Sequence, residues 1–386
     1  MTDGVLGSLL PHIEKQYNIN YAIVSLLWLG NALGWILIGF TGHYLDDFIG
    51  KWKSLILSAF CYIIMSSILA SGTLFPVLVV GLFFGGVGGA IGLSQLNIFL
   101  SKLGPKYLGI YHGCYGVGAC AGPLLATVMT DRGLKWNYFY FCLLGLSLIN
   151  TVSMMITFKG CDEDLKPYYN DDNDEAEAGV KKNHDFVAAL KDLRTWLGCI
   201  FIFFYQGSEV SMGGWVVTFI LNYRKGNPST VGFVSSGFWA GVTVGRFFLT
   251  SSMIKYIGSR RSVIILAVLC IAFDILTWLI PEQIAAGVFA SLAGVFIGPI
   301  VPILYSFFAR TLPRRIRFCS MVLMTAFGSS GGSAVPFMVG MLSQVSGTYV
   351  LHPIFLACYA VMFIVWIMMP NIERKGAHKN LWQKFW

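Results

Sequence analysis

The stretch Ile49–Leu57, "IGKWKSLIL", has a near copy 208 residues later in Ile257–Ile265, "IGSRRSVII". Each copy places a glycine and two basic residues at the start of a long apolar run. Other matches follow in the same order at offsets of 206 to 213 residues, and they pair Pro105 with Pro313, the glycine-rich segment near Gly88 with the one near Gly294, and Pro123 with Pro336. The sequence therefore predicts two related halves that run in parallel.

The composition indicates that these halves lie in a membrane and not in water. Of 386 residues, 56% are hydrophobic and only 12% are charged, whereas a soluble domain carries roughly 25% charged residues. The net charge of +8 lies in short clusters between apolar stretches, which is typical of membrane orientation and argues against nucleic acid as a partner. We predict a polytopic, multi-pass integral membrane protein that acts as a monomer in the lipid bilayer.

A spanning helix needs about 20 apolar residues. Eleven stretches meet this need, near residues 19–42, 53–72, 74–101, 107–130, 135–158, 196–222, 228–252, 260–280, 283–308, 316–344 and 350–370. The first residues, "MTDGVLGSLLPHI", are typical of the end of a twelfth span, so we expect the start codon to lie inside the first helix, which is then truncated. A genuinely short amphipathic N-terminus is the alternative.

Lys and Arg gather in the loops on one side of these spans, and this asymmetry predicts that side, with both chain ends, as cytoplasmic. The predicted domains are an N-terminal transmembrane bundle (1–158), a polar cytoplasmic linker (159–194), a C-terminal transmembrane bundle (195–371) and a cytoplasmic tail (372–386). The fold class is all-α, with two six-helix bundles. Parallel repeats of this kind are the architecture of alternating-access transporters, which bind their substrate between the halves.

The sequence offers no machinery for covalent chemistry. It has no Walker-type phosphate loop and no nucleophile elbow. Its nine cysteines and six histidines show no metal-ligand spacing and no disulfide framework. We therefore expect no enzyme, no ATP-driven pump, no cofactor and no metal.

One carboxylate, Glu209, lies inside a long apolar run in "YQGSEVSMGGW" (Tyr205–Trp215). A charge near the bilayer centre costs at least ~2.5–3.5 kcal/mol, so intramembrane acids usually mark a pathway or a partner. The repeat offset of 206 residues places Asp3 as its counterpart. We predict that Glu209 faces a water-filled cavity opposite Asp3, with room left by the small residues Gly207, Ser208, Ser211, Gly213, Gly214, Gly4 and Gly7. A packing carboxylate held by a neighbouring donor is the alternative.

Two segments carry a family resemblance. "GHYLDDFIGKWK" (Gly42–Lys53) resembles the loop motif of the major facilitator superfamily, although Asp47 stands where a basic residue is usual and Ile49 is an insertion. "YQGSEVSMGGW" and "GFVSSGFWAGVTVGR" (Gly232–Arg246) resemble the fucose/proton symporter branch, including fungal bypass-of-stop-codon-type proteins. The resemblance implies that Asp46 helps to latch one conformation, and that Arg246 is a gating charge unless it snorkels to lipid phosphate.

The same resemblance implies a transporter of a small polar solute, with a monosaccharide as the expected class. In the bacterial symporters of this branch, acids in the first and fourth helices handle the proton and the sugar. Asp3 matches the first, but the fourth helix carries Gln95 and Asn97 without a carboxylate. Proton-coupled symport and facilitated transport therefore both stay open, as does the choice between the plasma membrane and an internal membrane such as that of the vacuole.

The remaining candidate residues are weighed by their chemistry. Amides and aromatic faces suit polyhydroxy solutes, and such candidates are Gln95, Asn97, Gln206, Trp215 and Trp239, although tryptophans are also interface anchors. His112 can titrate near neutral pH or simply pack, and Asp274 is expected to have a structural partner. A transport-inactive nutrient sensor of the same fold, which the short tail disfavours, and a non-functional product of a truncated gene model are the alternative functions.

Overall fold

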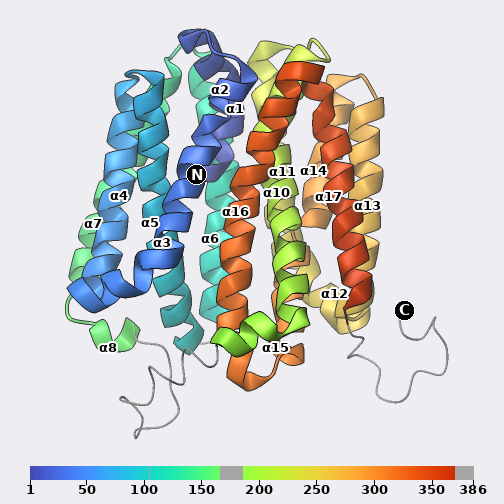
Figure 1. Ribbon diagram of the computed structural model, residues 1–386. Coiled ribbons are helices and arrows are strands. Elements are labelled where there is room, and N and C mark those ends of the chain that lie inside the picture. Colours follow the sequence, from blue (N-terminus) through green and yellow to red (C-terminus); the bar gives the residue numbers. More distant parts are fainter. Residues whose placement is uncertain (104, 166–185, 370–386) are drawn as a thin grey trace, which may run out of the picture.

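The computed structural model describes residues 1–103, 105–165 and 186–369, and this part of the chain is all-helical (Figure 1). The predicted all-α fold is confirmed. Most of the predicted linker and the tail 372–386 lie outside the described residues. The N-terminal half contains α1 (Thr2–Tyr17), α2 (Tyr21–Val24), α3 (Leu26–Ile49), α4 (Lys51–Ser71), α5 (Phe75–Leu103), α6 (Pro105–Asp131), η1 (Trp136–Tyr138), α7 (Phe139–Thr157) and α8 (Asp162–Leu165).

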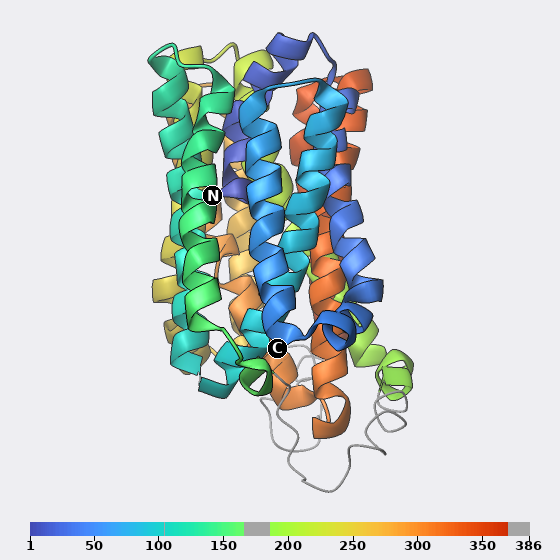
Figure 2. The same ribbon diagram turned by 90° about the vertical axis from the view of Figure 1, so that its left-hand side faces the viewer.

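The second half repeats this plan with two interruptions inside its helices, at η2 and between α14 and α15. Its elements are α10 (Leu193–Asn222), α11 (Pro228–Val244), the π-helical segment η2 (Gly245–Leu249), α12 (Thr250–Tyr256), α13 (Ser259–Leu279), α14 (Gln283–Ile297), α15 (Ile300–Thr311), α16 (Arg314–Ser346), η3 (Thr348–Val350) and α17 (Leu351–Met368). Figure 1 shows the two halves side by side, and Figure 2 shows the outer side of the first half, where α4 packs along α7.

Nine helical stretches of the described chain are long and apolar enough to cross a membrane. They coincide with nine of the eleven predicted spans. The other two predicted spans, 196–222 and 228–252, form α10 and the continuous run α11–η2–α12, and they fall outside that set. The first of these helices carries Glu209, and the second run carries Arg246.

The repeated glycine motif takes the same backbone conformation in both halves. Gly50 precedes α4 with φ 85° and ψ 157°, and Gly258 precedes α13 with φ 92° and ψ 152°. A positive φ is readily available only to glycine. The two copies therefore build the same helix start, which supports the repeat that the sequence predicted.

In each half, the helix that follows this glycine is held at its start by hydrogen bonds to the last helix of the half or to the segment after that helix. In the first half, Asp162 Oδ1 accepts a hydrogen bond of 3.1 Å from the backbone N–H of Trp52. In the second, the buried Arg260 donates to the carbonyls of Met369 at 2.6 Å and of Ile367 at 2.9 Å. Unpaired groups at helix ends are thus satisfied without water.

The halves meet through close helix pairs, chiefly α1 with α10, α6 with α11, and α3 with α16. A Cβ added at Gly7 of α1 would lie 2.1 Å from the carbonyl oxygen of Gly213 on α10. Small residues allow such backbone approach, which membrane interfaces need because lipid supplies no hydrophobic driving force between helices. At the end opposite the linker, Tyr21 Oη accepts a hydrogen bond of 2.8 Å from Asn222, so the halves are joined there.

Candidate functional site

The site is built around an ion pair in the middle of the second half. Glu209 lies near the middle of α10 and is only 4% exposed. Arg246 Nη2 lies 2.6 Å from Glu209 Oε1. A buried carboxylate is tolerated when it is paired and hydrogen-bonded, so the pair answers the energetic problem that Glu209 raises in an apolar helix.

Arg246 reaches this position from the π-helical segment η2. Such segments are rare and are frequent at functional sites. Here a Cβ added at Gly245 would lie 2.0 Å from the carbonyl oxygen of Val295, so η2 runs hard against α14. The wider turn sets Arg246 facing α10.

Two carbonyls at the end of α14 complete the surroundings of the pair. Tyr205 donates a hydrogen bond of 3.0 Å to the carbonyl of Ile297 and lies 3.3 Å from Glu209 Oε1. Arg246 Nε lies 3.4 Å from the carbonyl of Gly298. Pro302 has no N–H to offer that carbonyl, and the break between α14 and α15 therefore leaves it free for the guanidinium.

The pair is also linked to the first half. The guanidinium carbon of Arg246 lies 6.0 Å from the ring centre of Tyr115 on α6, within reach of a cation–π contact. Tyr115 donates a hydrogen bond of 3.0 Å to Asp3 Oδ2 on α1. An interface chain, formed by Asp3, Tyr115, Arg246, Glu209 and Tyr205, thus crosses from one half to the other.

This arrangement corrects two expectations. The glycines that were expected to leave open space beside Glu209 instead let helices touch: a Cβ added at Gly207 would lie 2.4 Å from Val335, and one at Gly4 would lie 2.2 Å from the carbonyl oxygen of Ala119. Arg246 binds Glu209, so the alternative in which it snorkels to lipid phosphate is wrong.

The other predicted solute ligands lie at different places. Gln95 is buried on α5, and Oδ1 of Asn97 on the same helix is buried with no hydrogen-bond partner in the described part of the chain. Gln206 lies against α16, where a Cβ added at Gly328 would be 2.7 Å from its Oε1.

The two candidate tryptophans are wholly inside the protein, so the interface-anchor alternative is wrong for both. Trp215 stacks on Trp28 with ring centres 5.4 Å apart and donates a hydrogen bond of 3.0 Å to the carbonyl of Pro336. Trp239 is 1% exposed, and its indole nitrogen lacks a partner among the described residues. The side chains of Asp46 on α3 and His112 on α6 lie outside the described part of the structure.

Asp274 has the structural partner that was expected. Its Oδ1 lies 2.7 Å from His352 Nδ1, and both side chains are fully buried between α13 and α17. Sequence reasoning missed Tyr205 and Tyr115. Tyr205 lies one helical turn before Glu209, a spacing that brings two side chains together; nothing local in the sequence identifies Tyr115 as a bridge.

Comparisons with known proteins agree with the fold. The chain is 24% identical to Bypass of stop codon protein 6 of Saccharomyces cerevisiae over 96% of its own length and 80% of that protein. It is 26% identical to a glucose/galactose transporter of Brucella abortus, over 47% of this chain and 45% of that one.

Among solved structures, the Escherichia coli fucose:proton symporter superposes with a TM-score of 0.65 at 15% identity, covering 94% of this chain and 95% of that one. A D-xylose–proton symporter superposes with a TM-score of 0.69 at 13% identity, covering 95% of this chain and 94% of that one. These two likenesses show the fold. The family model of the Major Facilitator Superfamily matches residues 1–226. The chain therefore belongs to the Major Facilitator Superfamily, a family of membrane transporters and not of enzymes.

Proposed function

We propose that this transporter moves a small neutral polar solute, of monosaccharide size, by rocking its two halves as the units 1–158 and 195–371. The observation that carries the proposal is the interface chain, which links a carboxylate of one half to an ion pair of the other. In parallel-repeat transporters the substrate site lies near the midplane between the halves. Asp3, Tyr115 and Arg246 lie where the two halves face each other.

Sugar is the proposed class because hydroxyl groups match the groups gathered near the interface. Carboxylate, guanidinium and phenol bind hydroxyls in both donor and acceptor roles. Relatives support this class by their names alone: a glucose/galactose transporter, a fucose:proton symporter and a D-xylose–proton symporter.

Proton coupling is the finer part of the proposal, and it depends on the acids of the interface chain. Arginine stays charged under all physiological conditions, so any proton exchanged within the chain comes from a carboxyl or a phenol. Glu209 has its cation within its own half, whereas Asp3 accepts a hydrogen bond from Tyr115 of the first half. Both acids are candidates for the coupling group.

The test is uptake by purified protein in liposomes, with monosaccharides and polyols supplied with and without a pH gradient. A solute-dependent flux is expected, and a transporter that uses protons accumulates solute only when the gradient is imposed. Glu209→Gln and Asp3→Asn then identify the coupling acid, because that variant loses accumulation but keeps exchange at equal concentrations. Specific binding without any flux would contradict transport and favour a nutrient sensor of the same fold.

A further inference from the structure

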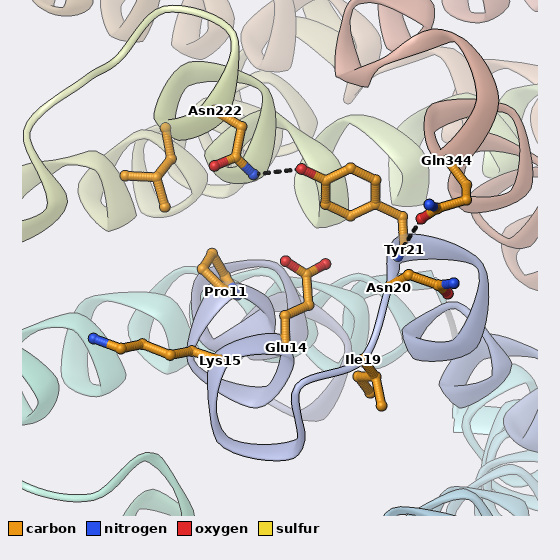
Figure 3. A pocket seen from close by; sticks show the side chains of 9 residues that line it. Pro11, Glu14, Lys15, Ile19, Asn20, Tyr21, Asn222 and Gln344 are labelled. Carbon is orange, nitrogen blue, oxygen red and sulfur yellow. Dashed lines mark hydrogen bonds between the residues drawn. The ribbon is translucent and has the colours of Figure 1, made fainter.

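A pocket lies away from the interface chain, at the end of the bundles opposite the linker (Figure 3). Its volume is about 420 Å³, within the range of roughly 300–1,000 Å³ typical of small-molecule sites. The walls come from α1 and the turn after it in the first half, and from α10 and α16 in the second, through Pro11, Glu14, Lys15, Ile19, Asn20, Tyr21, Leu221, Asn222 and Gln344.

The wall leaves both donors and acceptors for a ligand. Asn222 donates its amide N–H to the Tyr21 hydroxyl at 2.8 Å, which leaves its carbonyl oxygen as an acceptor. Gln344 accepts from the Tyr21 backbone N–H at 3.1 Å, which leaves its NH₂ group as a donor. Figure 3 shows both amides at the rim, on either side of the Tyr21 ring.

Glu14 carries a buried oxygen in this pocket that lacks a hydrogen-bond donor in the described part of the chain. Its Oε1 is buried and has no hydrogen-bond partner among the described residues. Its carboxyl group points across the pocket toward Tyr21 in Figure 3. A buried acceptor without a donor costs free energy, so a molecule that brings an O–H to this point is favoured.

The polar groups of the wall favour a neutral ligand over an ionic one. Glu14 and Lys15, an acidic and a basic residue, both border the pocket. A metal or ammonium cation would use only acceptors, and an anion only donors, whereas the wall presents both kinds. A hydroxyl group donates and accepts at once.

We propose that this outer pocket is a binding site for a neutral polyhydroxy solute of monosaccharide size. None of its lining residues belongs to the interface chain. Tyr21 in its wall packs against Trp215 with ring centres 6.0 Å apart, and Trp215 stacks on Trp28 at 5.4 Å. Since its walls come from both halves, the pocket exists only while the halves are joined at this end. A bound solute therefore stabilises that conformation.

The test reads solute occupancy at the pocket itself and needs no transport. Ile19→Cys places a thiol in the wall without removing a polar group. The purified full-length protein is labelled with a polar maleimide, and the labelling rate at residue 19 is followed by peptide mass spectrometry, so that the native cysteines do not interfere. The probes are D-glucose and mannitol, with choline and acetate as charged comparisons.

Saturating D-glucose or mannitol is expected to slow labelling at least about threefold. Adding Gln344→Leu removes one hydrogen bond and raises the half-protective concentration by about threefold to tenfold. The exposed amide of Asn150 on α7 is the matched control, and Asn150→Leu is expected to change nothing. Glu14→Gln keeps protection because a neutral amide still binds hydroxyls, whereas Glu14→Leu weakens it.

Three results would overturn the inference: no protection by D-glucose or mannitol, protection by choline or acetate alone, or protection that Gln344→Leu and Glu14→Leu leave unchanged. The last result would mean that the solute acts from the central site. Protection without flux in liposomes would leave the outer pocket standing and remove the proposed transport function.

Discussion

Removing the cation of the buried ion pair isolates its energetic role. Arg246→Met takes away the guanidinium but retains an apolar side chain of similar length. Glu209 is then left with one described hydrogen-bond donor, the Tyr205 hydroxyl at 3.3 Å. Its carboxyl group must stay charged without a cation or take up a proton, and either state is less favourable than the native pair.

The expected cost follows from the geometry. Breaking a buried ion pair by removing one partner typically costs about 3–5 kcal/mol. The lower end applies here, because the Arg246 side chain keeps 16% of its surface exposed and Tyr205 still binds Glu209. A loss of about 3 kcal/mol corresponds to roughly 100-fold in the unfolding equilibrium. The double variant Glu209→Gln/Arg246→Met removes both charges, and we expect it to be at least about 1 kcal/mol more stable than the single variant.

The assay is equilibrium unfolding of the purified protein in detergent micelles, followed by tryptophan fluorescence. Arg132→Met is the matched control, since Arg132 lies in an exposed turn and its loss is expected to change stability by less than about 0.5 kcal/mol. If Arg246→Met is no less stable than this control, or if the double variant is as unstable as the single, the guanidinium does not hold the carboxylate.

Three further outcomes are expected in the same assay. Gly7→Ala is expected to lower the free energy of unfolding by about 1–3 kcal/mol, because its Cβ would lie 2.1 Å from the Gly213 carbonyl oxygen. Gly39→Ala, whose Cβ would have no atom within 4 Å, is the control and is expected to be neutral or stabilising. Equal effects of the two variants would refute the close packing of α1 on α10. His352→Ala leaves Asp274 buried and unpaired and is expected to cost about 3–5 kcal/mol, and a cost under 1 kcal/mol would contradict a structural role. Arg194 lowers the pKa of Asp192, so Asp192→Asn is expected to destabilise the protein at pH 7, and its effect is lost as the pH falls through the folded pKa. A difference that does not shrink at all as the pH is lowered below the ordinary pKa of an aspartate would contradict this linkage.

The spans and the repeat could be predicted because both depend on residue type and spacing alone. An apolar run of sufficient length reads as a spanning helix in any context. The match of Gly50 with Gly258 was also informative, since the backbone conformation at a helix start is a local property. The helix interruptions were not predicted. The π-helical segment at Gly245 depends on the close approach of α14, which is a tertiary contact.

The sequence predicted several residues of the candidate site but not which residues contact one another. Glu209, Asp3 and Arg246 stand out as charged residues in apolar surroundings, and all three belong to the interface chain. The partners of each could not be read from the sequence, because Arg246 lies 37 residues from Glu209 and Tyr115 lies 112 residues from Asp3. The small residues near Glu209 led to the wrong prediction of open space, since glycine occurs both beside open space and where helices approach closely.

The contacts of the interface chain differ in what motion would do to them. Glu209, Arg246 and Tyr205 belong to one half, so a rigid rocking of the halves would leave their hydrogen bonds intact. The contact of Arg246 with the Tyr115 ring crosses between the halves, whereas the hydrogen bond of Tyr115 to Asp3 lies within the first half. Separation would therefore break the contact of Arg246 with Tyr115, the residue that binds Asp3, while the ion pair of Glu209 with Arg246 would move with the second half. The liposome comparison of Asp3→Asn with Glu209→Gln therefore tests whether the acid at the moving interface or the acid paired within one half couples protons to transport.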